Sequence, residues 1–545
     1  MQLANHKRVP LEQKQRLSRS ILWKLQRNFY NDQGVEAWRT AGIPHHITSN
    51  PPIAEAYAKV VFGFLRDCHA ARHQTEGSSF PPVDSSQPIY IIELGSGHGR
   101  FSYLFIKRFL DIYRRSVLKD IPVKYVMTDF VERNVEYWRA HPWLQPFVEE
   151  GSLDFARFDL ESDQELRLVH SGALLSAETV QNPMVLIANY IFDSIPQDAF
   201  HIEDGQLYES LVTVLSTRHE PEADDPEILT RLQISYSYQT IGEDYYGDPE
   251  WNRILQNCRE RLPGTAFLFP TAALKFIENF RQLSGGRGLL LSADKGFNQD
   301  EALLEGQGMP GLTMHGNGCF SMMVDYQIIG EYFRQHSGHV LHPAHRHASI
   351  NISAFMFGNP PGGYIETRQA YEDAIEKFGP DDFHTLIRGI ETFYGALNLE
   401  QILASLRLSG WDYQLLRRCL PILKEYLADI SETQKQELYE AIQKTWDSYL
   451  PIGEEDDLAF HLGTLLLEME FYAEALEFLQ HSASLYGMEP GTAYNMGVCY
   501  HSLRQMEKAL ECINQALRLD PEFDAAKTLR IKLQSALGYQ AVQRL

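Results

Sequence analysis

The sequence predicts an α/β protein: N-terminal helices, then a domain built on a mostly parallel sheet, then a domain made only of helices. Short apolar segments that would form buried strands alternate with helical stretches such as residues 101–115. The strand candidates are Ile89–Leu94, 125–129, Met184–Asn189 and Gly288–Asp294. This alternation is typical of a parallel sheet with both faces covered. After about Gly363 the strand pattern ends, and the rest of the chain reads as helix.

Composition and charge define the broad class of protein. The chain has 545 residues, of which 44% are hydrophobic and 22% charged, which is ordinary for a globular protein of roughly three or four domains. Its longest mostly apolar run, residues 183–192, is too short to span a membrane. We therefore expect a soluble protein without a membrane span. The net charge of -23 repels phosphate backbones, so we expect no nucleic acid among its partners.

The cysteines and the N-terminus bear on the compartment. The six cysteines never form a C-x-x-C pair, and this spacing fits neither a disulfide framework nor a structural zinc site. We therefore expect a reducing compartment, the cytoplasm. Residues 1–30 are basic but lack a long apolar core, so we expect no secretory signal. Residues 18–30 fit an amphipathic helix, and a mitochondrial targeting segment is the alternative.

The predicted elements divide the chain into four parts. Residues 1–75 form a helical region, in which apolar residues recur at helical spacing. Residues 76–362 form the sheet domain, interrupted by an acidic insertion or solvated loop at about 219–250. Residues 363–455 form a helical connecting domain, and residues 456–545 carry an internal repeat.

The internal repeat has a period of about 34 residues. Leu462-Gly463 corresponds to Met496-Gly497, and Ala475 to Ala509. Small residues at fixed places let two helices touch closely, and the pattern resembles the tetratricopeptide repeat. Two unrelated helical hairpins are the alternative. The resemblance implies a surface that binds a protein partner. Because about three repeats are needed for stability, we expect these two to stack on the helices of residues 383–449.

A glycine-rich loop follows the first predicted strand, in the sequence IYIIELGSGHGRF. Glu93 ends the strand, and Gly95, Gly97 and Gly99 alternate before a predicted helix. Glycines permit a tight bend and the close approach of a ligand, and the helix N-terminus offers unpaired N–H groups. The dinucleotide fingerprint would need glycine where Arg100 stands.

The acid-x-Gly-x-Gly-x-Gly pattern resembles motif I of the class I S-adenosylmethionine (SAM) methyltransferases. The resemblance implies a Rossmann-like sheet domain of the class I methyltransferase type, with SAM as its cofactor. It also implies that Glu93 lies near the amino-acid portion of SAM. A nicotinamide site and a plain turn are the alternatives.

Later acids extend the resemblance. Asp129 ends the next strand, where these enzymes place a carboxylate that accepts the two ribose hydroxyls. Asp159 falls where an acid beside the adenine amino group is expected, and a solvated strand end is the alternative for both. Asn189 ends the fourth strand and would face the methyl group and its acceptor. The predicted cofactor-binding residues are therefore Glu93, Gly95, Gly97, Gly99, Asp129 and Asp159.

Residues 185–212 resemble one particular family within this class of methyltransferases. This segment is similar to the MidA family of SAM-dependent methyltransferases, whose mitochondrial members are linked to respiratory complex I assembly and to arginine methylation. The residues that match the pattern of that family are Asn189, Asp193, Pro196, Phe200 and Glu209.

Two departures from the MidA pattern bear on the reaction. Tyr190 stands where the family has Glu, and Lys295 stands where it has Tyr. Carboxylates grip a guanidinium bidentately. Tyr190 cannot do so, and an arginine acceptor therefore depends on Asp193, which is alternatively the cap of the next helix. The predicted catalytic residues, which would border the acceptor pocket, are Asn189, Tyr190 and Asp193.

The resemblance implies a SAM-dependent methyltransferase whose acceptor is a protein, with arginine as one candidate, recruited by the repeats. One alternative is a methyltransferase-like scaffold or assembly factor that has lost transfer and binds partner proteins. A nicotinamide-dependent oxidoreductase is the other. We predict no metal site, because the histidines between residues 336 and 347 lack a carboxylate or cysteine at ligand spacing.

Overall fold

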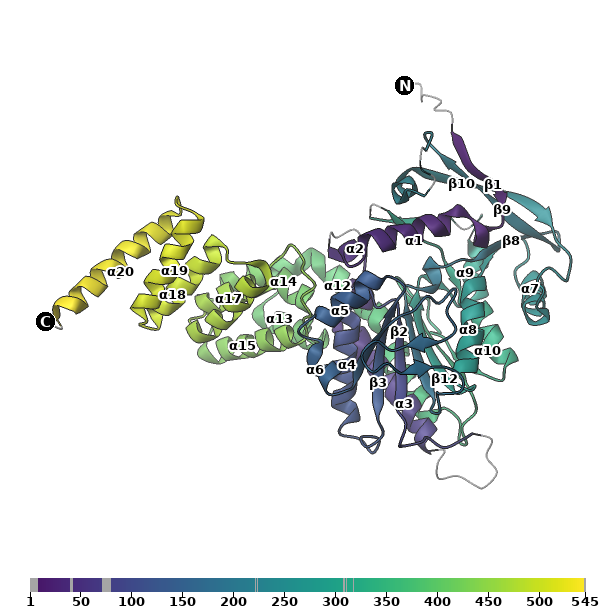
Figure 1. Ribbon diagram of the computed structural model, residues 1–545, viewed down its shortest axis with the longest axis horizontal. Helices are drawn as coiled ribbons and strands as arrows, with labels where there is room; N and C mark the ends of the chain where they lie inside the picture. The colour runs from purple at the N-terminus through teal and green to yellow at the C-terminus, as the bar shows by residue number, and fades with distance from the viewer. Residues whose placement is uncertain are drawn as a thin grey trace. The chain divides into compact units, whose positions relative to one another are not determined.

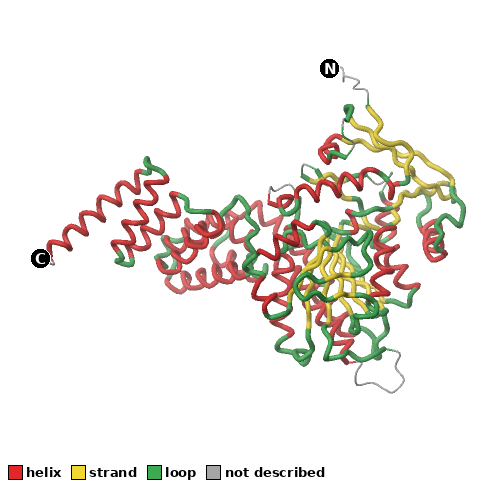
Figure 2. The backbone as a smooth tube through the Cα atoms, viewed as in Figure 1, coloured by secondary structure: helices red, strands yellow, loops and turns green. Residues whose placement is uncertain are grey.

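The computed structural model describes residues 8–39, 43–70, 80–220, 222, 224–306, 309, 311–316 and 318–543. The chain divides into two compact units between Leu386 and Ile387. The first unit holds the strands, and the described part of the second is built from helices (Figure 1, Figure 2). The predicted boundary at residue 75 falls within residues 71–79, which lie outside the described residues.

A seven-stranded sheet forms the centre of the first unit, in the order β17-β18-β12-β7-β2-β3-β4. The strands are β2 (Ile89–Leu94), β3 (Val123–Asp129), β4 (Leu153–Arg157), β7 (Met184–Asn189), β12 (Gly288–Asp294), β17 (His339–Leu341) and β18 (Asn351–Phe357). β18 runs antiparallel to both of its neighbours, and the other pairings in the sheet are parallel. This mostly parallel sheet with N-terminal helices is the class I methyltransferase-like, Rossmann-like fold, and the predicted fold class is confirmed.

Burial explains why the sequence reveals these strands. β12 is buried along its whole length and β7 up to Ala188, so both read as continuous apolar runs. The main helices around the sheet are α3 (Pro51–Ala70), α4 (Arg100–Tyr113), α5 (Glu132–Ala140), α6 (Gln145–Glu149), α8 (Thr271–Leu283) and α10 (Tyr326–Gln335). Apolar side chains of α8 and α10 join those of the strands in one continuous core.

The order of the strands creates a switch point at β2. The chain passes from β2 to β3 on one side, and β7 later pairs with β2 on the other side. In an open α/β sheet, ligands bind outside the carboxyl ends of the strands at such a point. The glycine-rich loop that follows β2 lies at this position.

A second, antiparallel sheet is formed by four strands inserted between β7 and β12 and by one strand from the N-terminal part of the chain. Its strands are β1 (Val9–Gln15), β8 (Asp198–Glu203), β9 (Gln206–Ser216), β10 (Leu232–Thr240) and β11 (Ala266–Phe269), and α7 (Pro249–Arg261) precedes β11. β10 pairs with β9 from Leu232 opposite Ser216 to Thr240 opposite Tyr208. The predicted acidic insertion at 219–250 is therefore not only a solvated loop. It contains the strand β10, which carries no charge and lies between acidic stretches.

Helix α1 (Ile21–Gln33) packs its apolar face on this second sheet. Leu22 and Leu25 of the helix share a core cluster with Val212 and Val214 of β9. α1 and the short α2 (Glu36–Arg39) belong to the predicted N-terminal helical region, which also contains the strand β1. The pairing of β1 with β9 joins residues about 200 positions apart, and the local pattern of the sequence does not reveal such a contact.

The first unit continues beyond the last strand of the sheet. α11 (Ile365–Tyr371) docks on α3, where the Asp67 carboxylate accepts hydrogen bonds from the N–H groups of Glu366 (3.0 Å) and Thr367 (2.8 Å). A Cβ atom on Gly63 would lie 2.7 Å from the Glu366 carbonyl oxygen, so the contact requires glycine. The first unit therefore includes helix beyond residue 363.

The remaining short elements of the first unit connect these parts. They include β5 (Leu166–Arg167), β6 (Leu174–Leu175), β13 (Gly296–Phe297), β14 (Thr313–His315), β15 (Cys319–Ser321), β16 (Val324–Asp325), α9 (Asp300–Glu305) and the 3-10 helix η4 (Phe192–Ser194). The boundary between the two units falls within α12 (Pro380–Ile390). None of the helices in the described part of the chain has the length and apolar character needed to cross a membrane.

The second unit is a series of helices, and its last part has the predicted repeat. The helices are α13 (Leu399–Leu408), α14 (Tyr413–Tyr426), α15 (Glu432–Asp447), α16 (Leu458–Glu468), α17 (Tyr472–Tyr486), α18 (Pro490–Ser502), α19 (Met506–Leu519) and α20 (Asp524–Gln543). A Cβ on Gly463 of α16 would lie 2.9 Å from Leu479 of α17, and one on Gly497 of α18 would lie 2.7 Å from Ile513 of α19. The same small residue thus permits the same close contact in both helix pairs.

This contact predicts the effect of a substitution at Gly497. Gly497→Val should destabilise the α18–α19 pair by about 1–3 kcal/mol, because the added side chain overpacks a buried seam. Hydrogen exchange measured by mass spectrometry should show faster exchange in peptides from these helices. Gly491→Val is the matched control in α18, since a Cβ there comes no closer than 3.4 Å to another residue. Equal exchange in both variants would contradict the prediction.

Candidate functional site

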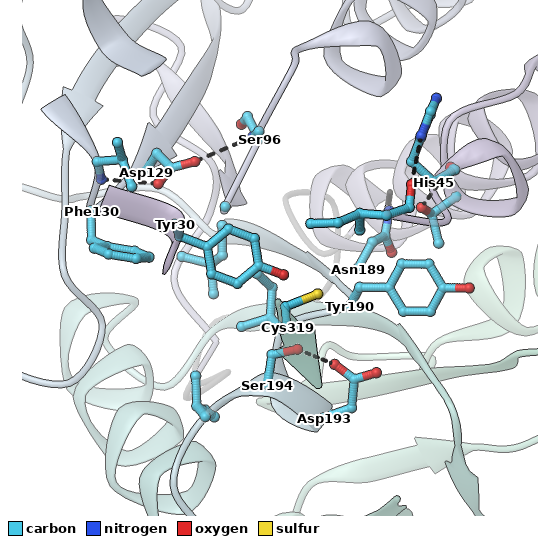
Figure 3. Close-up of a pocket in the computed structure, with 18 of the residues that line it drawn as sticks. Tyr30, His45, Ser96, Asp129, Phe130, Asn189, Tyr190, Asp193, Ser194 and Cys319 are labelled. Atoms are coloured by element: carbon cyan, nitrogen blue, oxygen red, sulfur yellow. Dashed lines mark hydrogen bonds between the residues drawn. The ribbon is translucent and has the colours of Figure 1, made fainter. Parts of the chain in front are cut away.

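A pocket of about 190 Å³ opens at the carboxyl ends of β2, β3 and β7 (Figure 3). The glycine-rich loop and the residues that follow β3 and β7 line it, together with parts of α1, the loop 43–49 and β15. Figure 3 shows Asp129 and Phe130 on one side of the pocket and Asn189, Tyr190 and Asp193 on the other. The predicted site residues that line it are Glu93, Gly95, Gly97, Asp129, Asp159, Asn189, Tyr190 and Asp193.

The glycine-rich loop bends through three residues in the left-handed region. The φ angles are +57° at Gly95, +52° at Gly97 and +80° at Gly99, which only glycine adopts without strain. Gly99 lies just before α4 and differs from the others in position. It is not among the residues that line the pocket, and a Cβ there would lie 2.9 Å from Met127 beneath the loop. Gly99 therefore permits the bend of the loop but does not itself line the pocket.

Glu93 is buried at the base of the loop. Its Oε2 accepts hydrogen bonds from Ser96 (2.8 Å) and Tyr125 (2.8 Å), and from Ser102. Burial raises the pKa of Glu93 to about 7, although the three donors favour the ionised form. None of the described residues donates to Oε1, so this oxygen remains available to a ligand.

Asp129 ties the loop to the end of β3. Its Oδ2 accepts from the Gly97 N–H (3.3 Å) and from Asn134 Nδ2 (2.9 Å), and its Oδ1 accepts from the Val131 N–H (3.0 Å). Burial raises the pKa of this carboxyl, and the hydrogen bonds oppose that shift. The carboxylate is thereby held at the edge of the pocket with a fixed orientation.

Asp159 lines the pocket, but its carboxylate is already engaged. Arg27 of α1 donates to both of its oxygens, at 3.2 and 2.6 Å, and also donates to Glu161 at 2.9 Å. Burial acts to raise the pKa of Asp159, but Arg27 lowers it below its usual value. The Arg27 guanidinium also lies over the ring of Phe130, 4.6 Å from its centroid. An ion pair therefore closes this end of the pocket.

At the other end, Asn189 has one used and one unused hydrogen-bonding atom. Tyr57 of α3 donates to its Oδ1 at 2.9 Å, and its Nδ2 is buried with no partner among the described residues. The next residue, Tyr190, has a φ of +55°, a conformation that is strained for a tyrosine. Its N–H donates to the Ala293 carbonyl oxygen at 2.9 Å, which holds it against the end of β12.

Asp193 lies inside η4 and does not cap it, because the N-cap position is Ile191. Ser194 donates to the Asp193 carboxyl at 2.7 Å, and the Asp193 N–H donates to Asp294 Oδ1 at 3.4 Å. Asp294, at the end of β12, also accepts from Tyr326 (2.8 Å). Burial and the neighbouring Asp294 carboxylate raise the pKa of Asp193 well above its usual range, although Ser194 and Lys295 act to lower it.

Several aromatic and polar residues that the sequence analysis did not select also line the pocket. Tyr30 of α1 is hydrogen-bonded to Cys319 of β15. His98 of the glycine-rich loop is buried, with its ring 5.6 Å from that of Trp38 and 4.7 Å from that of His45. Burial lowers the pKa of His98 well below its usual range, so it is neutral. No local pattern connects the N-terminal residues with the loop, because only the tertiary fold brings them together.

The histidines between residues 336 and 347 have separate partners. His342 is hydrogen-bonded to Ser353 (2.9 Å) and His347 to the Gly296 carbonyl oxygen (2.9 Å). The described residues contain no group of three or more histidine, cysteine, aspartate or glutamate side chains placed to hold a metal ion.

Known proteins resemble separate parts of the chain. The family model of the tetratricopeptide repeat matches residues 492–523. Intraflagellar transport protein 70A of Danio rerio is 35% identical over 89 residues, which are 16% of this chain and only 14% of that protein.

Solved structures from Burkholderia thailandensis resemble the larger part of the chain at low identity. An uncharacterised protein of the COG1565 superfamily has a TM-score of 0.37 and 12% identity, over 62% of this chain and 88% of that one. A second member of that superfamily, bound to S-adenosyl-homocysteine, has a TM-score of 0.36 and 11% identity, over 61% and 93% of the two chains. A 1,6-didemethyltoxoflavin-N1-methyltransferase has a TM-score of 0.28 and 9% identity, over 66% and 99%.

The burial of Glu93 predicts a pH dependence of stability. An unfolded glutamate has a pKa of about 4.3, whereas that of Glu93 in the folded chain is about 7. Between these values the folded state holds a proton that the unfolded state has lost, so this group lowers stability as the pH rises. The melting temperature of Glu93→Gln should therefore fall less than that of the wild type between about pH 5 and pH 7. Parallel profiles would contradict the prediction.

Proposed function

We propose that this protein is a SAM-dependent methyltransferase that acts on a protein acceptor. One observation carries the proposal: the loop after β2, Asp129 at the end of β3 and Asn189 at the end of β7 converge on one pocket at the switch point of a class I methyltransferase-like sheet. The S-adenosyl-homocysteine bound to a COG1565 protein of similar fold is in keeping with this cofactor.

The residues of the pocket fit SAM. Asp129 would accept the two ribose hydroxyls, and Glu93 would receive the amino group of the amino-acid portion at its free Oε1. Phe130 offers an apolar surface to the adenine, and Asp159 would bind the adenine amino group only if Arg27 shared its carboxylate. The buried Nδ2 of Asn189 lacks a partner in the described part of the chain, which indicates that a ligand completes the site.

In such a site, SAM supplies an electrophilic methyl group, and the chain supplies position and surroundings. Transfer needs the acceptor atom in line with the methyl group, and alignment alone provides much of the acceleration. Tyr57 orients Asn189, and the backbone bond from Tyr190 to Ala293 fixes the end of β7 beside β12. Tyr30, Trp38 and Phe320 line the pocket with aromatic surface.

The repeats of the second unit support a protein as acceptor. Tetratricopeptide repeats form concave surfaces that bind peptides, and we propose that they recruit the protein to be methylated. An arginine acceptor is the narrower form of this proposal and needs Asp193 as an ionised carboxylate. The raised pKa of Asp193 weakens that form. The six free cysteines support a reducing compartment, and we propose the cytoplasm.

A scaffold that has lost transfer is the second candidate function. Tyr190 and Lys295 favour this second candidate, because both replace residues of the MidA pattern. They lie at the end of the pocket that Asn189 and Asp193 also line, which we call the acceptor end. A scaffold would transfer no radiolabelled methyl group to proteins in an extract from a strain that lacks this chain.

The proposed cofactor predicts a binding result. Calorimetry on the full chain should detect SAM, and at 100 times its dissociation constant SAM should stabilise the fold by about 2.7 kcal/mol. Gly97→Arg should abolish binding, because a side chain there enters the loop that cradles the ligand. Gly172→Arg is the matched control, since Gly172 has a similar φ of +72° and no neighbour within 4 Å. If the wild-type chain is folded but binds no SAM, the proposal that it is a SAM-dependent methyltransferase is refuted.

A further inference from the structure

The acceptor end of the pocket is rich in hydrogen-bond donors. The Nδ2 of Asn189 is buried without a partner among the described residues, and Tyr57 already occupies its Oδ1. Lys295 follows β12 next to Asn189, in a parallel pairing that sets Ala293 opposite Asn189. Both side chains line the same pocket. This end therefore holds an ammonium and a buried amide N–H that no described residue engages.

Lys295 has no ion-pair or hydrogen-bond partner for its ammonium among the described residues, although it is half-buried. Arg27 also lines the pocket, but its guanidinium already donates hydrogen bonds to Asp159 and Glu161. A half-buried cation without a partner is costly unless a ligand completes it. An anionic ligand group fits this position.

The acids near Lys295 do not replace such a ligand. Burial and Asp294 raise the pKa of Asp193, which weakens its charge beside Lys295, although Lys295 itself acts to lower that pKa. Asp294 is buried and occupied by Tyr326 and Ser292. Burial and Lys295 lower the pKa of His315, so this side chain is neutral. The surroundings favour a negative acceptor and disfavour a guanidinium.

We propose that the methyl acceptor is a carboxylate of a protein, held by Lys295 and Asn189, and that the product is a methyl ester. The inference rests on the proposed function. One carboxylate oxygen attacks the methyl carbon of the sulfonium and forms an O–C bond as the S–C bond breaks, and the electron pair of that bond stays on sulfur. The nucleophile is already ionised and loses no proton, so the step needs no general base.

The test uses the full chain, SAM with a tritiated methyl group, and protein extract from a strain that lacks this chain. Mild alkali hydrolyses methyl esters and releases volatile tritiated methanol, whereas N-methyl and S-methyl groups survive it. We expect most of the protein-bound label to become volatile. Label that stays on protein after alkali would overturn the inference and leave the methyltransferase proposal intact. Absence of any label despite SAM binding would overturn the proposed function itself.

Variants at Lys295 give the second readout. Lys295→Met should lower the rate of labelling roughly tenfold to hundredfold, the range for loss of a charge-assisted hydrogen bond, while SAM binding stays unchanged in calorimetry. Lys295→Arg keeps the charge and should retain most of the activity. Lys119→Met, at an exposed position that does not line the pocket, is the charge-matched control. Labelling by Lys295→Met at the wild-type rate would overturn the role of Lys295.

Discussion

The parallel alignment of β2, β3 and β7 is the constraint on which the candidate site depends. Parallel strands bring their carboxyl ends to one edge of the sheet, so Glu93, Asp129 and Asn189 meet although they are distant in sequence. The three left-handed glycines after β2 then turn the chain back under this edge. Without that bend, the backbone would fill the space that the pocket occupies.

The two ends of the pocket differ in charge, and burial explains the difference. At one end Arg27 forms ion pairs with Asp159 and Glu161, so the cation there is engaged by the protein itself. At the other end burial raises the pKa of Asp193, and the ammonium of Lys295 has no ion-pair or hydrogen-bond partner among the described residues. The strained φ of Tyr190 lies at this second end. Backbone strain of this kind persists where the surrounding structure holds it, and it is common at functional sites.

Much of the fold was predictable because its signals are local. β2, β7 and β12 are buried on both faces and appear as apolar runs, and the glycine pattern after β2 lies within a few residues. The strand β10 was missed because acidic stretches on both sides hide its uncharged sequence. β1 was missed because its pairing with distant β9, and not its own composition, makes it a strand.

The polar pairs of the site were not predictable, because they too join residues that are distant in sequence. Arg27 with Asp159, Tyr57 with Asn189, and Asp193 with Asp294 each join residues more than 100 positions apart. A single sequence indicates which residues end strands, but it does not indicate which distant side chains will form hydrogen bonds or ion pairs with those residues. Asp159 illustrates the limit, since its position matches the expected acid but its carboxylate already binds Arg27.

A crystal structure of the full chain with S-adenosyl-homocysteine would test the central claim most directly. The account predicts density in the pocket, with the ribose hydroxyls on Asp129, the amino-acid portion over the glycine-rich loop and the sulfur beside Asn189. Density for the ligand elsewhere on the chain, or in the pocket with the ribose away from Asp129, would contradict it.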